Sequence, residues 1–182
     1  MKKNQLSTTK STALILGKSK SLMGITKKLL ESKSKGLRKA KASQELTTLE
    51  GITIIGELMW EKETQEMTWY EATEYAKNLR LGGYDDWRLP TSEELLGVVI
   101  LCGGVVLALG DGDWEEIINK NKANEIYQTK YKVKGFESDY YWSSITNVDF
   151  KHDAWYVGFH YGNGDWDSKF NSSYARCVRG GQ

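Results

Sequence analysis

Residues 67–95 read MTWYEATEYAKNLRLGGYDDWRLPTSEEL, and they contain two helix starts of the same kind. In each, a Thr precedes a Glu by three residues: Thr68 with Glu71, and Thr91 with Glu94. Such pairs form capping boxes, in which the two side chains satisfy backbone N–H groups at a helix N-terminus. The first helix presents an apolar face made of Trp69, Ala72, Ala76 and Leu79, and it ends near LGGY. The stretch therefore predicts two helices joined by an extended segment, WRLP.

Strand-like runs lie on both sides of this stretch. Residues 52–62 (ITIIGELMWEK) form a β-rich run with Gly56 at a turn or bulge. After residue 140, the runs YYWSS, AWYVGFH and YARCVR are separated by GNG and NSS turns, which predicts antiparallel strands. Residues 95–110 are an apolar run predicted to be a core helix that leads into a buried strand or turn, and residues 113–128 a polar helix or irregular insert. This order predicts an α+β domain with two helices and a mostly antiparallel sheet.

Charge divides the sequence in two. Residues 1–45 carry 12 Lys/Arg and 2 Glu, whereas residues 46–182 carry 13 Lys/Arg and 22 Asp/Glu. We therefore expect a basic tail over 1–45, with a short amphipathic helix, in front of a folded domain over 46–182. The tail would be a solvated arm, or it would meet nucleic acid, an anionic membrane or an acidic partner. The acidic domain itself favours no contact with nucleic acid.

Targeting signals are weak in this sequence. The run ALILG at 13–17 has five apolar residues, fewer than the roughly 7 to 15 that a signal peptide needs. The apolar run 95–110 has sixteen residues with four Gly, which is too short for a membrane span. We expect no Sec export, and a cytoplasmic or virion-associated location is favoured.

No catalytic motif is recognisable. Cys102 lies in an apolar run and Cys177 in RCVR, and their spacing matches no zinc or redox motif, so both are expected to be buried thiols. The sequence has no G-x-S-x-G, P-loop or H-E-x-x-H pattern. We therefore predict no enzyme and no cofactor.

Two metal-site alternatives are weak. Asn163, Asp165 and Asp167 follow the first three ligand positions of a calcium loop, but Ser168 replaces the required Gly and Tyr174 the bidentate Glu. His152 and His160, with the nearby Asp residues, could bind zinc, but two exposed contact residues are the favoured interpretation. No metal is predicted.

The runs GELMWEK, MTWYEATEYAKNLRLGGYDDWRLPTSEEL, YYWSS and YARCVRGG together resemble the Lcl C-terminal domain family over roughly residues 50–180. That family resembles a branch of the C-type lectin fold, which also contains formylglycine-generating enzymes and the variable proteins of diversity-generating retroelements. The resemblance implies a C-type lectin-like fold. Relatives often carry a Cys in the first helix, near Ala76 here, so a disulfide to Cys177 is not expected and a reduced compartment is favoured.

The C-terminal segment has an unusual composition. All 15 Glu lie at or before Glu137, whereas residues 145–175 contain four Asp and no Glu, Gln or Met. The preference of turns for Asp contributes to this pattern. Randomised adenines in Asn codons would also produce it, because they give Asn, Asp, His, Tyr, Ser, Thr, Ile, Gly, Ala, Val and Phe but never Glu, Gln, Lys, Met or Trp. The chain therefore resembles a variable protein of a diversity-generating retroelement, in which Trp155 and Lys169 would be fixed.

We predict that residues of the accessible set form a diversified ligand-binding surface in segment 145–175. They are Asn147, Asp149, Phe150, His152, Asp153, Tyr156, His160, Tyr161, Asn163, Asp165, Asp167, Ser168, Phe170, Asn171, Ser172, Ser173 and Tyr174. Tyr, Ser, Asn and Asp also dominate antibody paratopes, where they give large contact area and adaptable hydrogen bonding. Most of the set, from Tyr156 to Tyr174, is expected to form one exposed patch.

A second set is predicted to be the structural frame. It consists of Trp87, Arg88, Pro90, Trp142, Trp155, Val157, Phe159, Arg176 and Cys177. In residues 155–160, strand alternation places Trp155, Val157 and Phe159 on a packed face and Tyr156 and His160 on the other, open face.

The function predicted from these patterns is non-enzymatic binding of a macromolecular ligand, a protein or a cell-surface molecule. Two alternatives stay open. One is an adhesin domain of fixed specificity for a carbohydrate or glycosaminoglycan, although the calcium-dependent sugar-binding signatures of C-type lectins are absent. The other is an enzyme similar to formylglycine-generating enzymes, which would need a pair of reactive cysteines.

Overall fold

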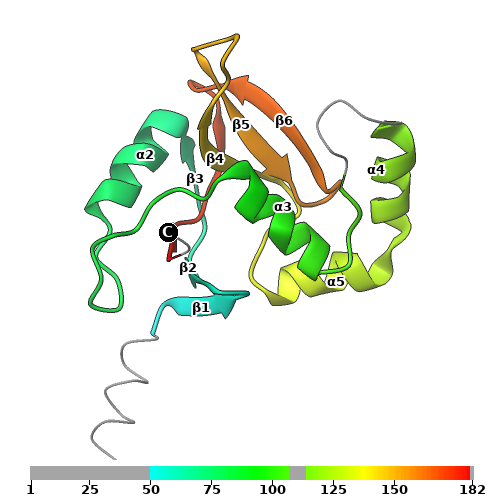
Figure 1. The fold of residues 1–182 in the computed structure, drawn as a ribbon, viewed down its shortest axis with the longest axis horizontal. Helices are drawn as coiled ribbons and strands as arrows, with labels where there is room; N and C mark the ends of the chain where they lie inside the picture. Colours follow the sequence, from blue (N-terminus) through cyan, green and yellow to red (C-terminus); the bar gives the residue numbers. More distant parts are fainter. Residues whose placement is uncertain (1–49, 107–113, 181–182) are drawn as a thin grey trace, which may run out of the picture. The chain divides into compact units, whose positions relative to one another are not determined.

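The computed structural model describes residues 50–106 and 114–180, which form an α+β fold (Figure 1). The predicted tail and its amphipathic helix lie outside the described residues. The elements, in chain order, are β1 (Ile52–Ile55), β2 (Leu58–Glu61), β3 (Gln65–Thr68), α2 (Trp69–Asn78), α3 (Ser92–Leu101), α4 (Trp114–Ala123), α5 (Glu125–Val133), β4 (Tyr140–Thr146), β5 (Asp153–Gly158), β6 (Asn163–Ser168), β7 (Ser172–Ala175) and β8 (Val178–Arg179).

Both predicted capping boxes are confirmed. The Glu71 carboxylate accepts a hydrogen bond from the Thr68 N–H at 2.9 Å, and the Thr68 hydroxyl accepts one from the Glu71 N–H at 3.3 Å. At the start of α3, Thr91 and Glu94 make the same reciprocal pair at 2.8 and 3.2 Å. These four bonds satisfy N–H groups that the helices themselves leave without partners.

The prediction of two helices is incomplete, because the described residues contain four. The predicted insert forms α4 and α5. Asn124 separates them, and its side-chain oxygen accepts a hydrogen bond from the Tyr127 N–H at 3.0 Å. Tyr127 and Tyr131, four residues apart on one face of α5, are fully buried. The helix α5 is therefore held by two tyrosines rather than by an apolar stripe.

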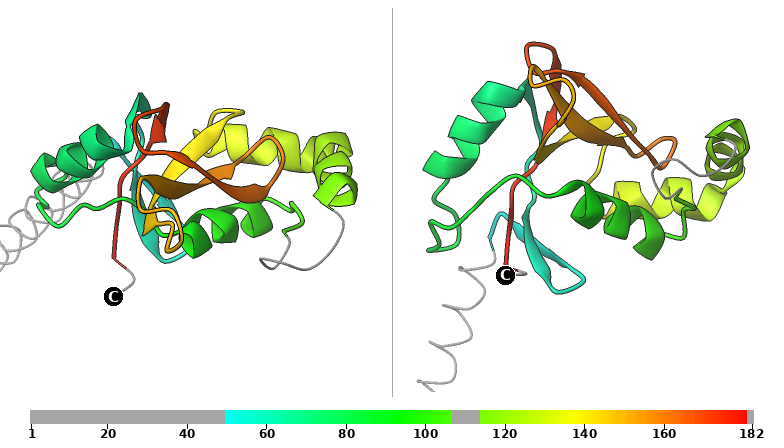
Figure 2. Two further views of the ribbon diagram at one scale, coloured as in Figure 1. Left: turned by 90° about the horizontal axis from the view of Figure 1, so that it is seen from above. Right: turned by 45° about the horizontal axis from the view of Figure 1, so that its top comes forward.

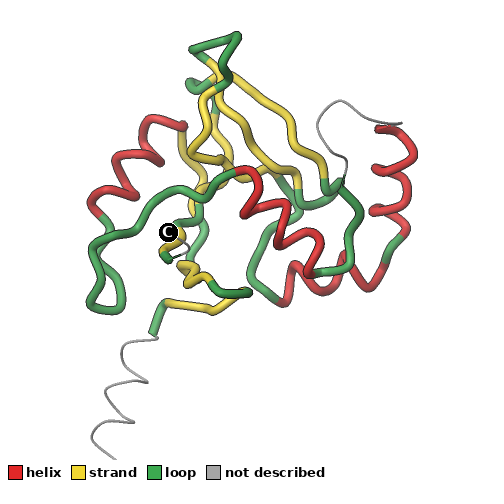
Figure 3. Tube along the Cα trace, in the orientation of Figure 1, coloured by secondary structure: helices red, strands yellow, loops and turns green. Residues whose placement is uncertain are grey.

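The strands form two sheets (Figure 3). The smaller has the order β1-β2-β8 and the larger β3-β7-β4-β5-β6. Neighbouring strands are antiparallel except for β4 and β7, which run parallel. Gly56, at the turn between β1 and β2, has a φ of 64°, a left-handed conformation that favours glycine. The mostly antiparallel arrangement predicted for the C-terminal strands is confirmed.

Two buried clusters hold the described residues together. One contains Leu95, Val98 and Val99 of α3 and the two α5 tyrosines, packed against β4 and β5. The other contains Ala72 and Ala76 of α2, with Trp87, Trp142 and Ala175. Figure 2 shows α2 and the pair α3 and α5 at different sides of the sheet strands. Helices therefore cover both faces of the large sheet. The helix α2 packs on one face, over strands β3, β7 and β4, and α3 and α5 pack on the other face.

The WRLP segment joins the C-terminal strand to the helices. Arg88 and Val178 exchange two backbone hydrogen bonds, of 3.0 and 2.8 Å. The Arg88 guanidinium donates to both carboxylate oxygens of Glu94 at 2.8 and 2.7 Å, and to the Gly180 carbonyl oxygen at 3.0 Å. Trp87 and Pro90, on either side, are buried. A bidentate Arg-carboxylate pair fixes geometry as well as charge, so this segment sets where α3 begins.

A buried polar cluster lies where the two sheets meet. Arg176 is 1% exposed; it donates to the carbonyl oxygens of Glu61 at 2.5 Å and Lys134 at 2.9 Å, and it lies over the Phe136 ring. Burial lowers the pKa of Arg176 to about 10, so it remains charged near neutral pH. The Glu61 carboxylate accepts hydrogen bonds from the Tyr75 hydroxyl and the Cys177 N–H.

Candidate ligand-binding face

The β5–β6 hairpin positions the side chains of the candidate site. Tyr156 lies opposite Asp165, Ala154 opposite Asp167, and Gly158 opposite Asn163. On the other side of β5, Trp142 pairs with Tyr156, and Tyr140 with Gly158. Directly opposite residues share a sheet face, and alternate residues along a strand return to it. One face of the hairpin therefore carries the residues that we call the tyrosine-aspartate face: Tyr140, Tyr156, His160, Asn163, Asp165 and Asp167.

Aromatic contacts form the floor of this face. The ring centres of Tyr140 and Tyr156 lie 4.3 Å apart, and those of Tyr140 and His160 lie 4.9 Å apart. The buried Trp142 lies beneath them, with its ring centre 5.7 Å from that of Tyr156. A Cβ atom at Gly158 would come within 2.7 Å of the Tyr140 ring, so glycine lets this ring lie flat on β5. The two tyrosines and the imidazole are consequently half-buried and held in place.

The face is acidic. Residues 152–168 contain three Asp and no Lys or Arg, and Asp165 and Asp167 are half-exposed. Burial, together with the negative charge of Asp165, raises the pKa of Tyr156. Burial also lowers the pKa of His160, although Asp139 acts in the opposite direction. At neutral pH the phenols therefore keep their protons, the imidazole is neutral, and the charge of the face is that of its carboxylates.

A second group of predicted binding residues lies at the end of the hairpin that is away from its turn. They follow or precede the strands there, beyond Asp153 at the start of β5 and Ser168 at the end of β6. Asp149, Phe150 and His152 lie in the β4–β5 loop, and Phe170 and Asn171 in the β6–β7 loop; all five are exposed. Ser172, at the start of β7, is exposed as well. The two groups are linked at one point, where the Asn171 amide donates to the Asp167 carboxylate at 2.9 Å.

Lys169 joins these two loops. Its ammonium donates to the Lys151 carbonyl oxygen and the Thr146 hydroxyl, both at 2.9 Å, and its backbone N–H donates to the His152 carbonyl oxygen at 2.8 Å. The side chain is 5% exposed and lies over the Trp69 ring. Lys169 is thus a buried part of the scaffold in the middle of a segment predicted to vary.

Three residues of the predicted set do not join the exposed surface. Asn147 is 5% exposed and caps its own turn, because its side-chain oxygen accepts from the N–H groups of Asp149 and Phe150. Asn163 is 8% exposed, beside Gly158. Tyr174 lies on the opposite sheet face and stacks on the buried Tyr141 at 5.5 Å. The expectation of one continuous exposed patch is therefore wrong: the structure separates a sheet face from a loop group.

The predicted frame residues are mostly buried. Trp142, Val157, Phe159, Arg176 and Cys177 are each at most 1% exposed. Trp155 differs, because it is only half-buried and makes an edge contact with the exposed Trp166, at 5.4 Å between ring centres. Tyr156, on the face expected to be open, is equally half-buried. Both faces of β5 are therefore packed in part, rather than one packed and one open.

Residues 55–179 match the Lcl C-terminal domain family, and this match runs from the last residue of β1 to β8 and includes all the described helices. The chain belongs to the Lcl C-terminal domain family. This is a lectin-like, binding-type domain. A comparison with curated proteins found no match for the chain.

The residues predicted as alternative metal ligands do not come together in the described part of this Lcl C-terminal domain. Asn163, Asp165 and Asp167 are alternate residues of β6, so their side chains are spaced about 6 to 7 Å apart along an extended strand and do not converge on one ion. His152 and His160 lie before and after β5, on the order of 20 Å apart. Within residues 50–106 and 114–180, no three His, Cys, Asp or Glu side chains are grouped as metal ligands.

The two thiols of the Lcl C-terminal domain are buried, as predicted. Cys102 packs in the cluster with α3 and α5, and Cys177 in the cluster with α2. Burial raises the pKa of both thiols. A reactive cysteine needs a lowered pKa and access to solvent, so neither residue suits nucleophilic or metal chemistry.

Sequence patterns missed one member of the site, Tyr140. Tyr140 belongs to the predicted strand YYWSS, and the predicted binding set includes only residues of segment 145–175. The signal was present in strand alternation, since Tyr140 is two residues before Trp142 and shares its face.

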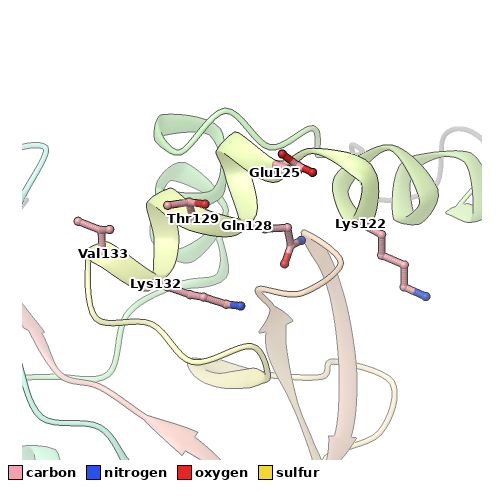
Figure 4. Close-up of a pocket in the computed structure, with 6 residues that line it drawn as sticks. All are labelled: Lys122, Glu125, Gln128, Thr129, Lys132 and Val133. Carbon is pink, nitrogen blue, oxygen red and sulfur yellow. The ribbon is translucent and has the colours of Figure 1, made fainter.

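A shallow hollow borders the turn after β5 (Figure 4). Its volume is about 590 Å³, and it is lined by Lys122, Glu125, Gln128, Thr129, Lys132 and Val133. The Gln128 amide donates to the carbonyl oxygen of His160 at 3.1 Å, and the Lys122 ammonium lies 4.6 Å from the Tyr161 ring centre. The hollow is therefore next to the tyrosine-aspartate face, but it carries lysines.

Within the described residues, no helix combines the length and apolar character that a membrane crossing requires.

Proposed function

We propose that this domain is a non-enzymatic ligand-binding module with a C-type lectin-like fold, and that the tyrosine-aspartate face is its recognition surface. One observation carries the proposal. Along β5 and β6, three residues of the predicted binding set, Tyr156, Asp165 and Asp167, lie together on one half-exposed face. The opposite face holds Val157 of β5 and Phe159, directly after the strand, and both are fully buried. The half-exposed side chains of Tyr156, Asp165 and Asp167 therefore lie apart from the Val157 and Phe159 side chains, which pack in the core.

The second part of the proposal is that segment 145–175 is diversified by a retroelement, with a protein or cell-surface molecule as ligand. The buried Lys169 supports it, because lysine lies outside the set that adenine replacement in Asn codons produces, and it holds the loops that carry Phe150 and Phe170. Sequencing the DNA around the gene is the direct test. We expect a near-identical repeat that differs only at adenines, beside a reverse transcriptase gene. A single copy of the segment with no such repeat would contradict diversification.

A mutational library tests the recognition face independently of the DNA. Positions 156, 165 and 167 are randomised in one library, and positions 154, 157 and 159, from the same hairpin but buried, in a matched one. Exposed positions tolerate substitution better than buried ones. We expect most members of the first library, and few of the second, to remain folded and protease-resistant. Equal intolerance at the two sets would contradict the assignment of this face to recognition.

The fixed-specificity alternative has its own candidate surface. Lys122 and Lys132 line one hollow, and their side chains extend along the same side of α4 and α5 in Figure 4. A sulfated glycosaminoglycan would bind there through its anionic groups. Heparin binding that is lost in a variant with both lysines changed to Gln would favour this function.

A further inference from the structure

The tyrosine-aspartate face combines aromatic rings with carboxylates that lack a described counter-ion. Within residues 50–106 and 114–180, no Lys or Arg nitrogen lies within 4.0 Å of the Asp165 or Asp167 carboxylates. Asp165 accepts a hydrogen bond from the Trp166 N–H, and Asp167 accepts from Ser168 and Asn171. These bonds are made by neutral donors, so both negative charges remain available to an incoming cation.

Among the described residues, two buried polar atoms lie under the same face without a hydrogen-bond partner. In the described part of the chain, no hydrogen-bond partner reaches Oδ1 of Asn163 or Nδ1 of His160, although both atoms are buried. Asn163 is only 8% exposed. Its Oδ1 lies close to Gly158, at 2.9 Å from the position that a Cβ atom on this glycine would take, and the Tyr140 ring borders the same position. The Asn163 oxygen is an acceptor without a described donor, so it adds to the negative potential at the surface above it.

The aromatic rings favour the same kind of ligand. The negative face of a Tyr ring attracts a cation placed above it, and Arg makes such contacts more often than Lys. A guanidinium also presents five N–H donors in a plane, which suits a surface of carboxylates and phenol oxygens. Among the described residues, Lys122 lies at this border over the Tyr161 ring, and burial and the positive charge of this lysine both contribute to lowering the pKa of His160.

We propose that the tyrosine-aspartate face binds a positively charged side chain, foremost an arginine, presented by a protein ligand. The inference rests on the proposed function, because it names the chemistry of the ligand for the same face. It assigns the carboxylates of Asp165 and Asp167 to charge pairing and the rings of Tyr140 and Tyr156 to stacking. A sulfated polysaccharide would be repelled by this face, and its site would be on the lysines of α4 and α5.

The test is a nuclear magnetic resonance titration of the full chain, labelled with ¹⁵N, with the peptide Ac-GRGRG-NH2. The acidic peptide Ac-GEGEG-NH2 and heparin are titrated in parallel. We expect the basic peptide to shift the amide signals of Gly158, Asn163 and Asp165, and to bind more weakly as salt is raised. The double variant Asp165→Asn, Asp167→Asn should weaken binding about fivefold or more. Asp85→Asn is the matched control, because it removes an exposed charge far from the hairpin in sequence.

Several results would overturn the inference. Absence of binding at millimolar peptide, unchanged affinity in the double variant, or shifts confined to other elements would each do so. If heparin or the acidic peptide shifts the signals of this face, the cationic assignment fails while the recognition face itself stands. The randomised libraries do not depend on the charge of the ligand, so they separate failure of the proposed function from failure of this inference.

Discussion

Lys169 and Trp69 contact each other through both side chain and backbone. The ammonium of Lys169 lies 4.5 Å from the centre of the Trp69 ring, and the N–H of Trp69 donates to the carbonyl oxygen of Lys169 at 3.2 Å. Trp69 is the first residue of α2, and Lys169 follows β6. The contact therefore attaches the loops at one end of the hairpin to the first turn of a helix, and Tyr70, next along that helix, contacts the exposed Phe170 at 5.4 Å.

Replacement of Lys169 should destabilise the domain. Lys169→Ala removes the donor for two oxygen acceptors and the contact with Trp69, and a lost buried hydrogen-bonded group costs about 2 to 4 kcal/mol. Lys151→Ala, at an exposed lysine that contributes only its backbone oxygen, should change stability by about 0.5 kcal/mol or less. Urea unfolding followed by Trp fluorescence measures both. Equal effects of the two changes would show that Lys169 does not hold these loops.

Sequence patterns predicted the local structure best where a specific side chain decides it. The capping boxes of Thr68 and Thr91 were predicted in detail because a capping box is local. The helix α5 was missed as a separate element because its packing depends on Tyr127 and Tyr131, whose partners lie far along the chain. The side of β5 that is exposed could not be predicted either. Alternation separates the two faces of a strand, but it does not say that Trp142 packs under Tyr156.

The buried Glu61 should give stability a pH dependence of its own. Burial raises the pKa of Glu61 despite the hydrogen bonds from Tyr75 and Cys177, so the folded state holds this proton more tightly than the unfolded state. The resulting contribution is complete below the unfolded pKa, near 4.5, and is lost as pH rises through the folded value. The difference in unfolding free energy between the wild type and Glu61→Gln should therefore change between pH 4 and neutral pH. A pH-independent difference would contradict a raised pKa.

The two thiols should be unreactive in the folded protein. Cys102 and Cys177 are both fully buried, in different clusters, and burial raises the pKa of each. We expect Ellman's reagent to label neither thiol quickly under native conditions and to label both in urea. Dithiothreitol should leave the thermal melt unchanged, because the two residues form no disulfide. Fast native labelling of Cys177 would revive the interpretation of this site as catalytic.

The last prediction ranks three aromatic residues by the cost of their removal. Phe159→Ala empties a fully buried site and should cost about 3 to 5 kcal/mol. Tyr156→Ala removes a half-buried ring that contacts Tyr140 and Trp142, so we expect an intermediate loss, on the order of 1 to 2 kcal/mol. Phe170, 68% exposed, should contribute about 0.5 kcal/mol or less. Urea unfolding of the three variants measures this order. A loss at Tyr156 as large as that at Phe159 would make Tyr156 a core residue, and a face that must keep Tyr156 could not be freely diversified.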